Sequence, residues 1–158
     1  MRRNDLVAGI YIGALVALAA LVTAVSMKDV LESHHDEKFL AWAGMAVLTL
    51  LLGRLAVRLP LRQFRISMSD IFLFATAAIF GPALATLNGA LDGYAASAHA
   101  RGAWYKRLFN TASMALSMNL SSWLFVKTSP ANGLPVLHSA LDYMFPLVLM
   151  AGAQYLLN

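Results

Sequence analysis

The sequence predicts an all-α fold, a polytopic membrane helical bundle of about six segments that forms a single transmembrane domain, residues 1–158. Two observations lead to this prediction. Of the 158 residues, 59% are hydrophobic and 13% are charged, with a mean hydropathy of +0.65, whereas soluble domains carry roughly a quarter charged residues. The apolar residues also form long runs between charged clusters, which is typical of multi-span membrane proteins.

The first span is predicted at residues 6–27, which contain no charge and match the roughly 20 residues that cross hydrocarbon. A secretory signal is the competing interpretation, because Arg2 and Arg3 precede the apolar run. The run exceeds the roughly 7–15 residues of a signal core, and the sequence "AVSMKD" is a poor cleavage context. We therefore expect a retained span.

A polar loop with a slight acidic excess is expected over residues 28–38. It carries His34 and His35, for which a solvated loop is the expected state and a metal site the alternative. The remaining segments are predicted at 39–60, 66–80, 81–99, 108–126 and 136–157. Near the end of the second segment, Arg54 and Arg58 share one helix face, and we expect their charged groups to reach the membrane surface by snorkelling.

The lysines and arginines predict the orientation of the chain. They gather at Arg2 and Arg3, over residues 54–65 and over residues 101–107. The positive-inside rule assigns these clusters to the cytoplasm, with both termini on the cytoplasmic side of the membrane. Residues 66–100 must then leave the cytoplasmic side of the membrane and return to it within about 35 residues, whereas two full spans need about 40. This segment is therefore predicted to be a short, tight helical hairpin.

The hairpin turn is predicted at Gly81-Pro82, because a proline disfavours helix at the preceding residue and suits the first turn of a new helix. Beyond the turn, small residues recur at four-residue spacing and predict a helix-packing ridge; they are Ala85, Gly89, Gly93 and Ser97. Gly89 and Gly93 form a GxxxG pattern, which allows the backbone of another helix to approach closely.

Asn88 and Asp92 form a polar row beside this ridge, also at i and i+4. One interpretation is that they only bond to neighbouring helices. The other is a ligand-binding site, because a carboxylate at membrane depth is costly and usually faces a cavity or a partner. Asp92 is about ten residues beyond the turn, roughly 15 Å along a helix and close to the middle of a membrane. Asn110 and Asp142 are further candidate ligand-binding residues, and Asp70 is expected in the first turn of its helix.

Several chemistries are excluded or disfavoured by the sequence. There is no cysteine, so disulfides and thiol catalysis are excluded. No P-loop, HExxH or nucleophile elbow is present, and we expect no catalysis and no metal site. The net charge of +4 is more typical of basic loops that fix topology than of nucleic-acid binding. The sequence identifies no cofactor.

The run "ISMSDIFLFATAAIFGPALATLNGALDGYAAS" and the following "ARGAWYKRLFNTASMALS" suggest a family. Over residues 66–120 the chain resembles the membrane-embedded N-terminal sensory regions of bacterial proteins with HD-GYP, GGDEF or histidine-kinase output domains. It is also similar to the six-helix substrate-binding subunits of energy-coupling-factor vitamin transporters, in which a Ser-Asp, Phe-Gly-Pro, Gly, Asp pattern is common. The sequence ends at "AGAQYLLN", where the signalling proteins continue into an output domain.

These resemblances imply a non-catalytic integral membrane module for sensing or ligand binding, located in a bacterial inner membrane. Two alternatives remain open: an accessory structural subunit of a larger respiratory or photosynthetic complex, and a small-molecule uptake subunit. The expected partners are the lipid bilayer and either other membrane subunits or a second copy of the chain.

Overall fold

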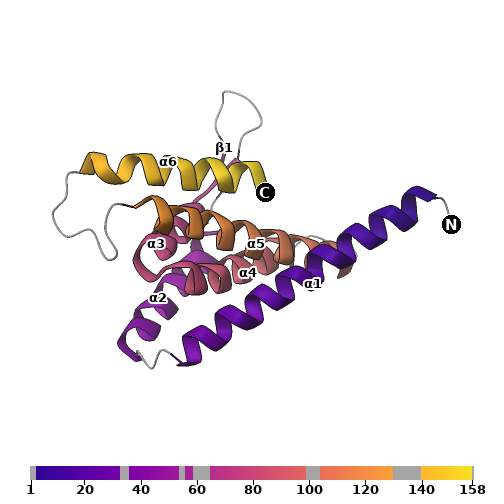
Figure 1. Ribbon diagram of the computed structural model, residues 1–158, viewed down its shortest axis with the longest axis horizontal. Helices are drawn as coiled ribbons and strands as arrows, with labels where there is room; N and C mark the ends of the chain where they lie inside the picture. Colours follow the sequence, from indigo (N-terminus) through magenta and orange to yellow (C-terminus); the bar gives the residue numbers. More distant parts are fainter. Residues whose placement is uncertain are drawn as a thin grey trace.

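The computed structural model describes residues 3–32, 36–53, 56–58, 65–98, 104–129 and 140–157. Within these ranges the protein is built from six helices and one short β-hairpin (Figure 1). The helices are α1 (Arg3–Glu32), α2 (Asp36–Leu52), α3 (Ser69–Phe80), α4 (Pro82–Ala98), α5 (Trp104–Thr128) and α6 (Ala140–Leu157). The strands β1 (Ala56–Arg58) and β2 (Arg65–Ser67) pair antiparallel between α2 and α3. The predicted all-α class is confirmed.

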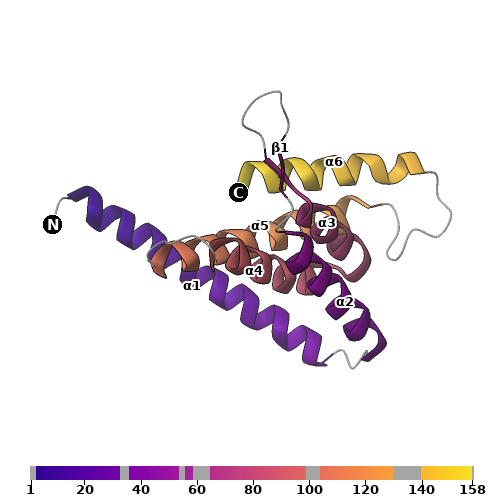
Figure 2. The same ribbon diagram turned by 180° about the vertical axis from the view of Figure 1, so that it is seen from behind.

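Helices α4 and α5 lie side by side at the centre of the molecule (Figures 1 and 2). Helix α1 packs across both of them and projects beyond them at its N-terminal end, while α6 lies along α5. Val30, near the end of α1, packs close to the start of α4, whereas Ala8 lies beside the start of α5. The starts of α1 and α5 therefore share one end of the molecule, and this end carries Arg3 and Lys106.

The α3–α4 turn lies at Gly81, as predicted. Its backbone adopts φ +82° and ψ −174°, a region that is essentially restricted to glycine. The Gly81 N–H donates to the Ala77 carbonyl and closes α3, while the Gly81 carbonyl accepts from the Ala85 N–H in the first turn of α4. Pro82 begins α4, where its missing N–H costs nothing. Asp70 lies in the first turn of α3, also as expected.

Two buried apolar clusters hold the helices together on either side of α4. The larger joins α3, α4, α5 and α6; it contains Leu73, Ala77, Ala85, Met114, Met118, Phe125 and Met150. The smaller joins α2 to the start of α4; it contains Trp42, Ala46, Leu84 and Leu87. In the smaller cluster the Trp42 Nε1–H donates to the Leu84 carbonyl at 3.1 Å, so the indole packs with its polar atom satisfied.

The prediction of a helical span to residue 60 is wrong, because α2 ends at Leu52. Gly53 closes the last turn by donating to the Thr49 carbonyl at 2.8 Å, a common role of glycine at helix ends. Beyond it, Val57 pairs with Ile66 across the hairpin, which suits β-branched side chains. Arg58 is therefore in a strand and does not share a helix face with Arg54, which lies outside the described residues.

Other boundaries also differ from the prediction. Helix α1 continues to Glu32 through part of the expected polar loop, and Lys28 Nζ lies 3.6 Å from Glu32 Oε1 in an i,i+4 pair that favours helix. Helix α5 begins at Trp104, so part of the basic segment is helical. His34 and His35 lie outside the described residues.

Among the described residues, α1 is the one helix long and apolar enough to cross a membrane. The candidate span, Val7–Glu32, has 26 residues; its most apolar window has a mean hydropathy of 2.3, and only 6% of that window is buried. A signal sequence at an N-terminus meets the same criterion. Shorter apolar helices occur at Lys38–Leu52 and Ser69–Phe80.

Candidate functional site

Asn88 lies where α2, α3 and α4 meet, and its side chain is fully buried. Its Nδ2 lies 3.1 Å from Thr49 Oγ1 on α2 and 3.0 Å from Thr76 Oγ1 on α3. Each threonine hydroxyl has a single proton, which it donates to the carbonyl four residues earlier, at 2.9 Å for Thr49 and 2.6 Å for Thr76. Both hydroxyls can therefore only accept from Asn88, which fixes the orientation of its amide group.

The other end of this amide has no partner. Asn88 Oδ1 is buried and accepts no hydrogen bond from any described residue. A buried polar atom without a partner typically costs about 1–3 kcal/mol, so a native protein rarely leaves one without a reason. The site thus contains an oxygen acceptor to which a bound cation, a donor or a water molecule can bind.

Asp92 lies one helical turn further along α4 and is 7% exposed. Its carboxylate accepts a hydrogen bond from the Ser69 side chain at the start of α3. A Cβ atom added to Gly53 at the end of α2 would lie 3.2 Å from Asp92 Oδ1. Asp92 is therefore enclosed at the junction where α2 ends and α3 begins.

In the part of the chain that the structure describes, the charged groups at this junction are negative. The carboxylate of Asp70 is close enough to interact electrostatically with that of Asp92. Among the side chains that the structure describes, no lysine or arginine forms an ion pair with Asp92. The junction has oxygen atoms from an amide, a hydroxyl and carboxylates, a set that favours a cation.

The packing of the small-residue ridge on α5 explains why Asn88 and Asp92 face other helices. Ala85, Gly89, Gly93 and Ser97 are all buried. A Cβ added to Gly89 would lie 2.7 Å from Met118 Cγ, and one added to Gly93 would lie 2.7 Å from the Asn110 carbonyl. The two glycines thus let the backbone of α5 approach α4 closely. The neighbouring row of Asn88 and Asp92 faces α2 and α3 instead.

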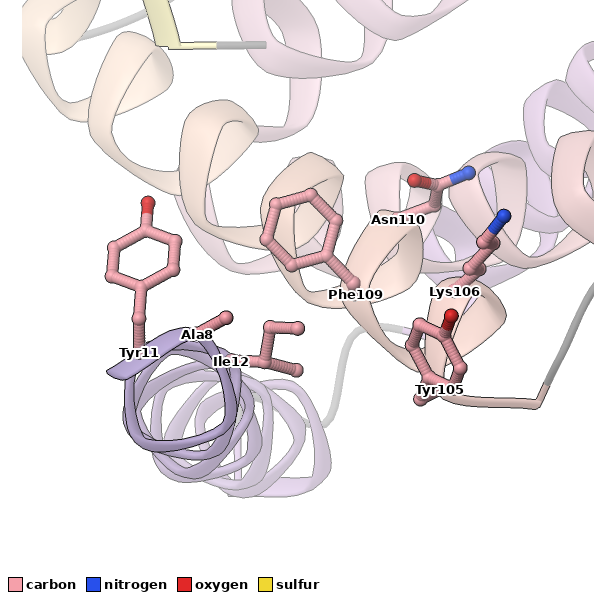
Figure 3. Close-up of a pocket in the computed structure, with 7 residues that line it drawn as sticks. All are labelled: Ala8, Tyr11, Ile12, Tyr105, Lys106, Phe109 and Asn110. Atoms are coloured by element: carbon pink, nitrogen blue, oxygen red, sulfur yellow. The ribbon is translucent and has the colours of Figure 1, made fainter. Parts of the chain in front are cut away.

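The other two predicted ligand-binding residues lie elsewhere. The Asn110 side chain is exposed and lines a groove between α1 and α5 (Figure 3). Asp142 is exposed in the first turn of α6. The structure thus brings Asn88 and Asp92 together and places Asn110 and Asp142 apart from them. Sequence reasoning also missed Thr49, Thr76 and Gly53, for which the available signal was a hydroxyl or glycine within an apolar run.

A second asparagine shows what a purely structural contact of this kind looks like. Asn119 Nδ2 on α5 lies 2.9 Å from Thr86 Oγ1 on α4, and Thr86 Oγ1 donates to the Pro82 carbonyl at 2.7 Å. Asn119 is only partly buried, and neither of its polar atoms is among the buried atoms without a partner. Asn88 differs because its carbonyl oxygen is enclosed and unsatisfied.

Within the described part of the chain, no group of three or more histidine, cysteine, aspartate or glutamate side chains is arranged to hold a metal ion. No protein-family model, curated protein or solved structure matches the chain. The resemblance to sensory regions and to transporter subunits therefore stays a prediction from the sequence.

Proposed function

We propose that this protein is a non-catalytic, polytopic membrane module for sensing or binding a ligand, and that Asn88 and Asp92 form its binding site for a small cation. One observation carries the proposal: the buried, unpartnered Oδ1 of Asn88 lies one helical turn from the enclosed carboxylate of Asp92. A cation bound between these oxygens would satisfy the amide and offset the cost of a buried negative charge.

The membrane part of the proposal rests on the outer surface of the bundle. Large apolar side chains are exposed on α1, α2 and α6; among the most exposed are Ile10, Leu21, Leu40, Phe145 and Leu156. Such a surface suits lipid contact and is unusual for a soluble monomer. Inside, the helices are held by glycine contacts and by side-chain hydrogen bonds between helices, both typical of packing in membranes.

The cation part rests on the chemistry of the donors. Asn88 Oδ1, the Asp92 carboxylate and the Ser69 hydroxyl are hard oxygen ligands, which suit alkali or alkaline-earth cations better than soft metals. Asp70 adds a second negative charge nearby. The ends of α2 and α3 enclose the site, which favours a small ion over a bulky ligand.

The test is thermal unfolding of the purified full chain in detergent. NaCl, KCl or CaCl2 is exchanged for N-methylglucamine chloride at constant ionic strength, because this bulky cation does not fit an enclosed site. A cation that binds the folded state should raise the melting temperature by roughly 2–4 °C for each kcal/mol that it adds to the free energy of unfolding. Asp92→Asn should fold and lose this rise.

Asp142→Asn is the matched control, because it removes an exposed carboxylate from another helix. It should keep the full cation-dependent rise. The proposal is wrong if the wild-type protein shows no such rise with any of the three salts, or if Asp92→Asn retains it.

The second candidate is an accessory subunit of a larger membrane complex. It is favoured by the exposed apolar face of α6, where Phe145, Val148 and Leu156 are more than half exposed. Native mass spectrometry of the protein purified from its own membrane distinguishes the two. A stoichiometric partner protein would favour the accessory role, and a single chain with a bound cation would favour the binding module.

A further inference from the structure

A groove of about 360 Å³ lies between the first turns of α1 and α5 (Figure 3). Its apolar side is formed by Ala8 and Ile12 of α1 and Phe109 of α5. Ile12 and Phe109 lie opposite one another across the groove in Figure 3. This floor offers contacts to an aliphatic chain and no polar group.

The rim of the groove is polar, and each polar side chain described on it can donate a hydrogen bond to an anion. Lys106 and Asn110 are one turn apart on α5, and Figure 3 shows their nitrogen atoms on the same side of that helix. Tyr11 and Tyr105 are 60% and 44% exposed and place two hydroxyls at the edge. Among the described side chains, no carboxylate lines the groove and none forms an ion pair with Lys106.

The position of the groove fits the surface of a membrane. Tyr11, Tyr105 and the 72% exposed Trp104 are the aromatic types that gather at membrane interfaces. Arg3 begins α1 and Arg107 follows Lys106, so the groove lies at a basic end of the molecule. Basic pockets between membrane helices at such an end favour anionic lipid headgroups.

We propose that this groove binds one anionic phospholipid. The Lys106 ammonium binds the phosphate, the Asn110 amide and the neighbouring Tyr105 hydroxyl donate to its oxygens, and an acyl chain packs on Ala8, Ile12 and Phe109. The site is separate from Asn88 and Asp92, so it stands whether or not those residues bind a cation.

Native mass spectrometry of the full chain, titrated with phosphatidylglycerol or phosphatidylcholine, tests the proposal. Phosphatidylglycerol should bind more tightly. Lys106→Gln should weaken phosphatidylglycerol binding about fivefold, the effect of one basic residue near an anionic membrane surface, and leave phosphatidylcholine binding unchanged. Lys127→Gln is the matched control, because Lys127 lies at the other end of α5, over the ring of Trp123. It should change neither affinity.

Ala8→Phe separates binding in the groove from attraction to a charged surface. Ala8 is exposed on its helix, so the larger side chain fills the groove without disturbing a core. It should weaken the binding of both lipids. Three results would each overturn the proposal: equal affinity of the wild-type protein for the two lipids, an equal loss of phosphatidylglycerol affinity in Lys106→Gln and Lys127→Gln, or unchanged lipid affinity in Ala8→Phe. Glycerol phosphate that competes as strongly as the lipid would assign the groove to a soluble phosphate ester instead.

Discussion

The Nδ2 of Asn88 lies 3.0 Å from Thr76 Oγ1, across the hairpin formed by α3 and α4. The two residues are each six positions from Pro82, so the contact fixes the pairing of the two short helices around their turn. The same nitrogen lies 3.1 Å from Thr49 Oγ1 and adds α2 to the pair. One amide group thus connects three helices through its donors and leaves its acceptor unsatisfied.

A double-mutant cycle measures this connection. Thr76→Val keeps the shape of the side chain and removes its hydroxyl, while Asn88→Ala removes the amide. We expect a coupling free energy of about 0.6 kcal/mol, the average for hydrogen bonds between membrane helices, and at most about 1.7 kcal/mol. Reversible unfolding in mixed detergent gives the value. The double-mutant cycle of Asn119→Ala with Thr86→Val provides the comparison. If that cycle shows coupling and the cycle of Asn88 with Thr76 shows none, the observed contact between Asn88 and Thr76 is contradicted.

Gly81→Ala tests the turn. The backbone at Gly81, with φ +82° and ψ −174°, is strained for any residue with a Cβ, so the substitution should lower the free energy of unfolding by about 1–3 kcal/mol. Gly44→Ala is the control, since a Cβ at this exposed helical position meets no atom within 4 Å. It should stabilise the protein by up to about 1 kcal/mol, as expected for glycine to alanine within a helix. Equal effects of the two substitutions would show that the turn relaxes.

The sequence predicted the turn and the ridge because both depend on local signals. Gly81-Pro82 stops and restarts a helix through its own backbone chemistry, and the spacing of Gly89 and Gly93 defines a face without reference to any other segment. The end of α2 was missed because the apolar residues continue past Gly53 into the β-hairpin of β1 and β2, so composition alone shows no boundary there.

The candidate site was predictable only in part for a related reason. The i,i+4 spacing of Asn88 and Asp92 is a property of one helix, so their shared face could be predicted. Whether Asn110 joins them depends on how α5 is rotated about its axis. The structure turns the Asn110 backbone toward Gly93 and leaves its side chain exposed at the rim of the groove, which no pattern within α5 reveals.

Gly93→Ala should destabilise the protein more than Gly44→Ala stabilises it. The added Cβ would lie 2.7 Å from the Asn110 carbonyl, a backbone atom that cannot move without shifting α5. Overpacking of this kind costs about 1–3 kcal/mol, and Gly93→Leu should separate the helices altogether. Unfolding in detergent measures both variants. Unchanged stability in Gly93→Leu would show that this face does not pack on α5.

Single-cysteine labelling tests the topology, and the absence of native cysteine makes each variant specific. The starts of α1 and α5 lie at one end of the molecule, so cysteines replacing Arg3 and Lys106 should both resist a membrane-impermeant thiol reagent in intact bacterial cells. Cysteines replacing Glu32 and Lys127, at the opposite ends of these helices, should react. Labelling of the first pair and protection of the second would reverse the predicted orientation. Different labelling within either pair would contradict the arrangement in which α1 and α5 begin at the same end of the molecule.

Asp92→Asn and Asp92→Leu together separate the structural role of Asp92 from cation binding. Asparagine retains an oxygen that accepts from Ser69, whereas leucine removes both the charge and this hydrogen bond. No described side chain forms an ion pair with Asp92, and a buried carboxylate without a counter-ion carries a desolvation cost. Without alkali cations, Asp92→Asn should therefore be at least as stable as the wild-type protein. Addition of the bound cation should then stabilise the wild-type protein alone and reduce or reverse that difference, because only the carboxylate provides the charge that holds the ion. Asp92→Leu should be insensitive to the cation and should be less stable than Asp92→Asn by about 1 kcal/mol, the net value of the lost hydrogen bond. Melting curves of the three proteins, with and without the cation at constant ionic strength, give all of these differences. If Asp92→Asn is less stable than the wild-type protein by the same amount under both conditions, the carboxylate serves only to connect α4 with α3.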